Sequence, residues 1–110
     1  TFILDASKEV PRRVSHPNRK TIGLRVPEHA VLQALLALHG APLLATTLIA
    51  PGEVEPLNDA LLIRERFEQP LAAVLDAGAC TSEPTTVVDL TGAEPELIRL
   101  GRGDPAKLGL

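Results

Sequence analysis

The chain has 110 residues, the size of one domain, and a formal net charge of −3 at pH 7. Its only aromatic residues are two phenylalanines, which disfavours an RNA-binding surface built from stacked aromatic rings. A single cysteine, Cys80, excludes an internal disulfide, and no apolar run is long enough to span a membrane. These features predict a cytoplasmic protein with no membrane contact.

Strand and helix patterns alternate along the first half of the chain. Residues 1–6 form an extended run, a polar loop with prolines follows, and residues 21–27 predict a second strand. Apolar residues recur at helical spacing over residues 28–40, where Gly40 is placed to cap the helix. Residues 41–52 then predict another strand.

The second half continues the alternation. Asn58 is placed to cap a helix over residues 59–69, and residues 71–78 predict a buried strand. Residues 85–92 and 96–103 predict two strands joined as a hairpin, followed by a loop-like tail. The pattern predicts an α/β fold with a twisted, open, mixed sheet and helices, in a chain long enough to bury a core.

The chain opens in the middle of a strand pattern and contains no methionine. We therefore expect residues 1–110 to form a single domain that is incomplete at its N-terminus. Such an end would leave an exposed sheet edge through which two copies of the chain could pair.

Patterns for metal binding and nucleophilic catalysis are missing. His16, His29 and His39 have no ligand spacing, and one cysteine cannot complete a thiolate site. Ser82 lies outside any nucleophile elbow. We expect neither a protein-bound metal nor a catalytic nucleophile.

Polar residues interrupt several apolar strands. Arg25 and Arg99 are cations in such strands, and threonine pairs occur at residues 46–47 and 85–86. Arginine binds carboxylate or phosphate, and hydroxyl groups complete the hydrogen bonding of such a ligand. The set favours a cleft for an anionic ligand, although each threonine could instead only pack at a strand edge.

The first quarter of the chain concentrates positive charge, and a basic loop could contact phosphates. The alternative is an ordinary solvated loop. The residues of this loop that we expect at RNA phosphates are Arg12, Arg13, Arg19 and Lys20.

Two segments, "TIGLRVPEHAVLQALLALHGAPLLATTLIAPG" and "EPTTVVDLTGAEPELIRLGRGDP", resemble the YrdC/YciO family, its YciO branch most closely. The opening "TFILDASKEVPRRVSHPNRK" resembles the same branch, so the resemblance covers the whole chain. It implies the C-terminal part of the YrdC-like fold, with a concave, positively charged face.

The resemblance also implies an activity for the full-length protein. Members of the YrdC type are nucleotidyltransferase-like enzymes that make threonylcarbamoyl-adenylate from threonine, bicarbonate and ATP. The product serves tRNA threonylcarbamoyladenosine modification, a translation-related role. ATP is a substrate here, with Mg²⁺ as its possible companion ion. The alternative is a non-catalytic module that binds double-stranded RNA or tRNA, a property also associated with the family.

The family's binding positions map onto five residues of this sequence. By resemblance, Arg25 and Thr85 would contact threonine. The positions implied at ATP are Thr21, Thr47 and Arg99.

Two departures from the family pattern concern the nucleotide. Thr47 replaces the serine of the family's S-x-N motif, and Ile49 replaces its asparagine, so an aliphatic group stands where an amide could donate and accept. In the family, a lysine and an arginine contact the ATP phosphates, and both lie before the segment that matches residue 1. We therefore expect the chain alone to be inactive.

Overall fold

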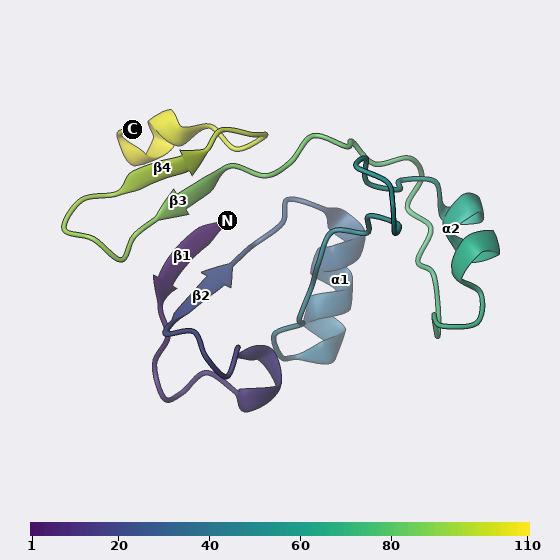
Figure 1. Ribbon diagram of the computed structural model, residues 1–110, viewed down its shortest axis with the longest axis horizontal. Coiled ribbons are helices and arrows are strands. Elements are labelled where there is room, and N and C mark those ends of the chain that lie inside the picture. The colour runs from purple at the N-terminus through teal and green to yellow at the C-terminus, as the bar shows by residue number, and fades with distance from the viewer. The chain divides into compact units, whose positions relative to one another are not determined.

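The computed structural model describes residues 1–110 and contains four strands, two α-helices and two 3-10 helices (Figure 1). The strands are β1 (Phe2–Asp5), β2 (Thr21–Leu24), β3 (Val87–Asp89) and β4 (Glu96–Arg99). The helices are η1 (Arg12–Val14), α1 (Ala30–His39), α2 (Ala60–Phe67) and η2 (Pro105–Leu108). No helix combines the length and the apolar character needed to cross a membrane.

The chain divides into two compact units. The first unit comprises Thr1–Leu44 together with Glu83–Leu110, and it holds the whole sheet and α1. The second unit, Ala45–Ser82, holds α2.

The four strands form one mixed sheet in the order β2-β1-β3-β4. β1 is antiparallel to β2 and parallel to β3, and β3 is antiparallel to β4. This confirms the predicted α/β fold with an open mixed sheet and the predicted terminal hairpin. The β1–β3 pair joins the first and last parts of the chain, while β2 and β4 are the edges (Figure 1).

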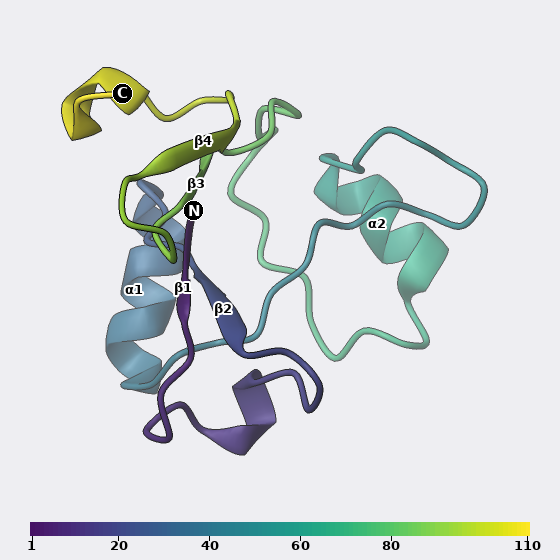
Figure 2. The same cartoon turned by 60° about the vertical axis from the view of Figure 1, so that its left-hand side comes forward.

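Helix α1 ends where its sequence predicts. Gly40 caps its C-terminus in the left-handed conformation, with φ 68°, and donates its backbone N–H to the Leu36 carbonyl. At the other end, the His29 Nδ1 accepts the Leu32 backbone N–H at 3.4 Å. Figure 2 shows α1 to one side of β1 and β2.

Helix α2 begins one residue later than predicted. Asp59, not Asn58, is its N-cap, because the Asp59 Oδ1 accepts both the Leu61 and Leu62 backbone N–H groups, at 2.9 and 3.1 Å. The Asn58 side chain instead donates to the Cys80 carbonyl at 2.8 Å. The expected cap residue therefore ties the helix start to a later loop.

Three predicted elements differ in the structure. Residues 41–52 and 71–78 form no strand, and the tail contains η2 instead of a continuous loop. Both missing strands fall largely in the second unit, which contains no strand of the sheet for them to pair with. An apolar run becomes a strand only when a neighbour completes its ladder of hydrogen bonds.

The buried core is smaller than a chain of this length can form. Only Ala50 and Val88 are buried apolar residues, and Thr86 is the one buried polar residue. Helix α1 buries none of its residues, and Leu38 on it is 90% exposed. The apolar pattern that predicted a core is thus largely open to solvent in this chain.

Candidate ligand-binding face of the sheet

The sheet register collects apolar side chains on one face. Phe2 lies opposite Leu24 on β2 and opposite Val88 on β3, and Val88 lies opposite Leu97 on β4. Residues that are directly paired across strands point to the same side of a sheet. We call this side, which carries the four paired residues, the apolar face.

The same register sends the expected ligand-binding residues of the first unit to the other side. Successive side chains of a strand alternate between faces. Thr21 and Arg25 are each an odd number of residues from Leu24, so they belong opposite the apolar face. Thr1 precedes Phe2, so its side chain also lies opposite the apolar face. The Thr85 hydroxyl contacts the Thr1 hydroxyl at 3.0 Å, which places Thr85 on the same side. We call this side the polar face, defined by Thr1, Thr21, Arg25 and Thr85.

A bulge adds Arg99 to the polar face. Val88 pairs with Leu97, but Val87 pairs with Arg99, so Ile98 is an extra residue in β4. Simple alternation from Leu97 would place Arg99 on the apolar face. The extra residue reverses the alternation and turns Arg99 to the side of Val87.

Arg99 and Thr85 are joined directly on this face. The Arg99 Nε and Nη2 groups both donate to the Thr85 carbonyl oxygen, at 3.0 and 2.9 Å, and Nη2 also reaches the Thr85 Oγ1 at 3.4 Å. The Thr85 hydroxyl is thus located between the Thr1 hydroxyl and the Arg99 guanidinium group.

Arg25 belongs to the same end of the polar face. Arg25 directly follows Leu24, which pairs with Phe2, so the register places it at the end of the sheet where Thr1 lies. Thr1 contacts Thr85 there, and Thr85 contacts Arg99. Arg25 is exposed and forms no ion pair within the chain. Two arginines and a hydroxyl group at one end of a sheet form a suitable place for an anionic ligand.

A second set of contacts secures the segment before β3. The Thr86 hydroxyl accepts the Gly101 N–H at 2.9 Å and donates to the Gly103 carbonyl, and the Arg102 N–H donates to the Pro84 carbonyl at 3.0 Å. The approach is so close that a Cβ on Gly101 would collide with the backbone of Pro84. These bonds hold residues 101–103 against residues 84–86, and we call this set of contacts the brace.

Sequence reasoning missed this brace, although two signals were present. The Thr85–Thr86 pair follows a proline, and a Gly-Arg-Gly segment follows the last strand. The sequence does not reveal which threonine is buried, because the assignment depends on the register between distant strands.

Thr21 and Thr47 are the other two residues expected at the nucleotide. Thr21 is on the polar face but at its opposite end, since it pairs with Asp5 whereas Leu24 pairs with Phe2. Four residues along a strand separate Thr21 from Arg25, about 13 Å. Thr47 is an exposed residue of the second unit, and Ile49 in the same segment is 46% exposed. The structure brings together Arg25, Thr85 and Arg99, but not Thr21 with them.

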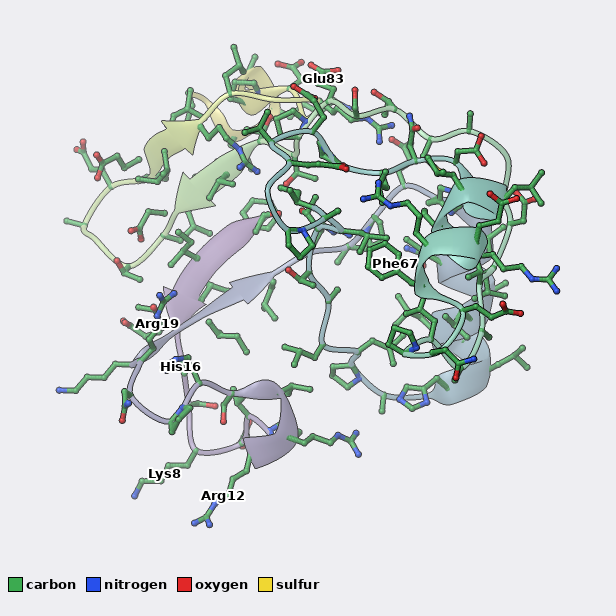
Figure 3. The ribbon with its side chains drawn as sticks, turned by 45° about the vertical axis from the view of Figure 1, so that its right-hand side comes forward. Lys8, Arg12, His16, Arg19, Phe67 and Glu83 are labelled. Atoms are coloured by element: carbon green, nitrogen blue, oxygen red, sulfur yellow. The ribbon has the colours of Figure 1, made fainter.

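The basic residues form a separate feature in the β1–β2 connection. This connection contains η1 and is held by short-range bonds, including the Val14 N–H to the Pro11 carbonyl at 3.0 Å and the Asn18 N–H to the His16 Nδ1 at 3.1 Å. Lys8 and Arg12 point away from the chain (Figure 3). We call this segment the basic loop; its exposed cations are Lys8, Arg12, Arg13, Arg19 and Lys20.

An open depression of about 540 Å³ surrounds the start of α1 and is lined by residues 26–30 and Gln33. None of the expected ligand-binding residues lines it. The structure also brings together no group of three or more His, Cys, Asp or Glu side chains able to hold a metal ion.

Comparison with known proteins places the chain in a family. The model of the Sua5/YciO/YrdC family, described as "Telomere recombination", matches residues 1–101. The "Uncharacterized protein YciO" of Escherichia coli K12 is 44% identical over 104 residues, which are 94% of this chain and 50% of that protein. A "Threonylcarbamoyl-AMP synthase" of Dichelobacter nodosus is 33% identical over 89 residues, which are 81% of this chain and 45% of that protein.

A solved structure agrees with the sequence matches. The crystal structure of Escherichia coli YciO aligns with a TM-score of 0.81 at 43% identity, covering 94% of this chain and 50% of that one. The chain therefore spans about half the length of the relatives it matches. The shared fold, the relatives and the family match together establish that this chain belongs to the Sua5/YciO/YrdC family.

Proposed function

We propose that this chain supplies a threonine- and nucleotide-binding face to a threonylcarbamoyl-AMP synthase-like protein of tRNA modification. The observation that carries the proposal is that the sheet register and the Arg99–Thr85 contacts place Arg25, Thr85 and Arg99 at one end of the polar face. The similarity to proteins named threonylcarbamoyl-AMP synthase supports the same reaction class.

Arg25 is the anchor for the threonine carboxylate in this proposal. It has no ion-pair partner in the chain, so its guanidinium group is available for a two-point contact with a carboxylate. Thr85 supplies a hydroxyl group at the same end of the sheet. Together they would hold the amino acid by its charged group and by a neutral hydrogen bond.

The nucleotide takes the remaining positions. We assign Thr21, Thr47 and Arg99 to ATP, which enters with bicarbonate as a substrate and with Mg²⁺ as its companion ion. Adenylate formation depends on positioning and on stabilising the phosphate charge. We assign turnover to the full-length protein, because the cations expected at the phosphates are not among residues 1–110.

Isothermal titration of the full-length protein with L-threonine, with and without ATP, tests the proposal. Arg25→Ala should weaken threonine binding by about tenfold or more, as expected for losing a charged hydrogen-bonded pair. The fold should survive, because Arg25 holds no other side chain in place. Arg13→Ala is the matched control: it removes one exposed arginine from the same unit and should leave threonine affinity unchanged.

Threoninol, which lacks the carboxylate, provides a ligand-side control and should not bind. Binding of threoninol as tightly as threonine would contradict a carboxylate anchor at Arg25. Retention of threonine affinity in Arg25→Ala would contradict the assignment in a second way.

A second function, RNA binding by a non-catalytic module, is favoured by the basic loop. Its five cations are exposed, and none of them forms an ion pair within the chain. Binding to double-stranded RNA through phosphates should weaken steeply between low and moderate salt. Arg12→Ala combined with Arg13→Ala should reduce the slope of log affinity against log salt by about one per lost phosphate contact. A slope equal to that of the unchanged protein would show that Arg12 and Arg13 do not contact the RNA phosphates.

A further inference from the structure

The middle of the basic loop contains a turn that a histidine closes. The His16 Nδ1 accepts the Asn18 backbone N–H at 3.1 Å, and the His16 carbonyl accepts the Arg19 backbone N–H at 3.4 Å. The first bond resembles an Asx turn, in which a side-chain acceptor binds the N–H two residues later. The ring of His16 therefore helps to hold residues 16–19 in this conformation.

This bond requires the neutral form of the His16 ring. A ring nitrogen that accepts a hydrogen bond carries no hydrogen, so the single hydrogen of the neutral imidazole is on Nε2. In the charged ring both nitrogens are donors, and Nδ1 can no longer accept from Asn18. Protonation of His16 therefore opens the turn. Histidine is the side chain that ordinarily changes charge between pH 5 and 8.

His16 lies among the positive charges of the basic loop. Figure 3 shows it near Arg19, and the loop cations both precede and follow it in the sequence. The carboxylates of this part of the chain are Glu9 in the loop and Asp5 at the end of β1. His16, the five cations and both carboxylates are exposed, and none of them forms an ion pair within the chain. A charged His16 is thus a sixth exposed cation in the middle of the loop.

We propose that His16 couples phosphate binding by the basic loop to pH. At high pH the neutral ring closes the turn, and at low pH the charged ring opens it and contributes a sixth cation to the backbone of a bound RNA. A phosphate group beside a histidine favours its charged form, so RNA binding and proton uptake promote each other. The proposal rests on the RNA-binding function proposed above and adds regulation by pH to it.

Titration of the full-length protein with double-stranded RNA at about pH 8 and about pH 5.5, each at several salt concentrations, tests this coupling. The affinity of the unchanged protein should be about two- to fivefold higher at the lower pH, which is the effect of one exposed charged contact. The slope of log affinity against log salt should be steeper by about one at the lower pH, because one more phosphate is neutralised.

Two substitutions of His16 separate its neutral and charged forms. His16→Asn keeps an acceptor for the Asn18 N–H but cannot gain charge, so its RNA affinity should be the same at both pH values and equal to the lower value of the unchanged protein. His16→Arg is charged at both pH values and should bind with the higher affinity at both. His39→Gln is the matched control, since it removes another exposed histidine from the same unit, and it should preserve the pH dependence. Equal pH dependence in His16→Asn and in the unchanged protein would overturn the proposal.

NMR of the free protein separates the histidine turn from the RNA-binding function. The backbone amide signal of Asn18 should shift together with the titration of the His16 ring, and His16→Asn should abolish this shift. An Asn18 signal that does not follow the His16 ring would refute the turn, whatever the protein binds. RNA binding of equal strength at both pH values would reject the coupling and leave the RNA-binding function standing. Absence of RNA binding at both pH values would reject that function and the coupling with it.

Discussion

Substitution of Gly101 by alanine offers the sharpest test of the brace between residues 84–86 and 101–103. A Cβ at Gly101 would collide with the Pro84 carbonyl oxygen and lie 2.7 Å from the Thr85 carbonyl carbon and 2.9 Å from that of Pro84. All three atoms belong to the backbone, so no side-chain rotation relieves the overlap. The two segments must separate.

The expected cost follows from the bonds that separation breaks. The Arg102 N–H loses the Pro84 carbonyl and the Gly101 N–H loses the Thr86 hydroxyl, each worth about 1 kcal/mol net. Separation also takes the Gly103 carbonyl away from the buried Thr86 hydroxyl, which then lacks both partners and adds about 1–3 kcal/mol, while alanine gives back about 0.4–1 kcal/mol by restricting the unfolded chain. We expect the free energy of unfolding to fall by about 2–4 kcal/mol.

Urea unfolding followed by far-UV circular dichroism measures this loss, since the chain has no tryptophan or tyrosine for fluorescence. With a denaturant slope of about 2 kcal/mol per molar urea, the middle of the usual range, the midpoint should fall by about 1–2 M, or the folded signal should be lost altogether. Gly92→Ala is the control: its Cβ would meet only the Glu94 carbonyl oxygen at an ordinary 3.6 Å. Equal midpoints for the two variants would refute the brace.

Three further predictions concern single side chains. Thr86→Val should cost about 1–3 kcal/mol in urea unfolding by leaving the Gly101 N–H unpaired, whereas Thr86→Ser should retain most of the stability; equal losses would contradict a role for the hydroxyl group. Asp59→Ala should remove the cap of α2 at a cost of about 1 kcal/mol, measured by the same method, and Asp59→Ser should restore most of it. The Thr91 hydroxyl donates to the Asp89 carboxylate, as does the Thr91 backbone N–H, and these two bonds, the hydroxyl first, lower the pKa of Asp89. The stability that they contribute is therefore present above the ordinary carboxyl pKa and is lost as the pH falls through the lowered pKa of Asp89. An NMR titration should show the pKa of Asp89 rising in Thr91→Ala, and an unchanged pKa would contradict this cause.

Short-range features of the fold were predictable from the sequence. The spacing of apolar residues located α1, and Gly40 marked its end, because helix formation and capping involve residues within one turn of each other. The terminal hairpin was predictable for the same reason, as its strands are joined by a short turn. Asn58 shows the limit of this reasoning: two adjacent residues could cap α2, and a bond to the distant Cys80 accompanies the choice of Asp59.

Long-range pairing decided the rest. The apolar run at residues 41–52 resembles a strand, yet it forms none, because a strand needs a partner that local sequence does not provide. The residues expected at the candidate site came from the family resemblance and their roles stay predictions, whereas their grouping in space could not be predicted from the sequence. Thr1 and Thr85 meet only through the parallel β1–β3 pair.

Arg99 illustrates what the sequence by itself determined and what only the tertiary structure decided. Its place in an apolar strand and its charge are properties of the sequence, and they were enough to mark it as a candidate ligand-binding residue. Which face it occupies depends on one extra residue, Ile98, in the pairing of β3 with β4. Side chains alternate with a period of two, so a one-residue shift in register moves an arginine from the apolar face to the polar face.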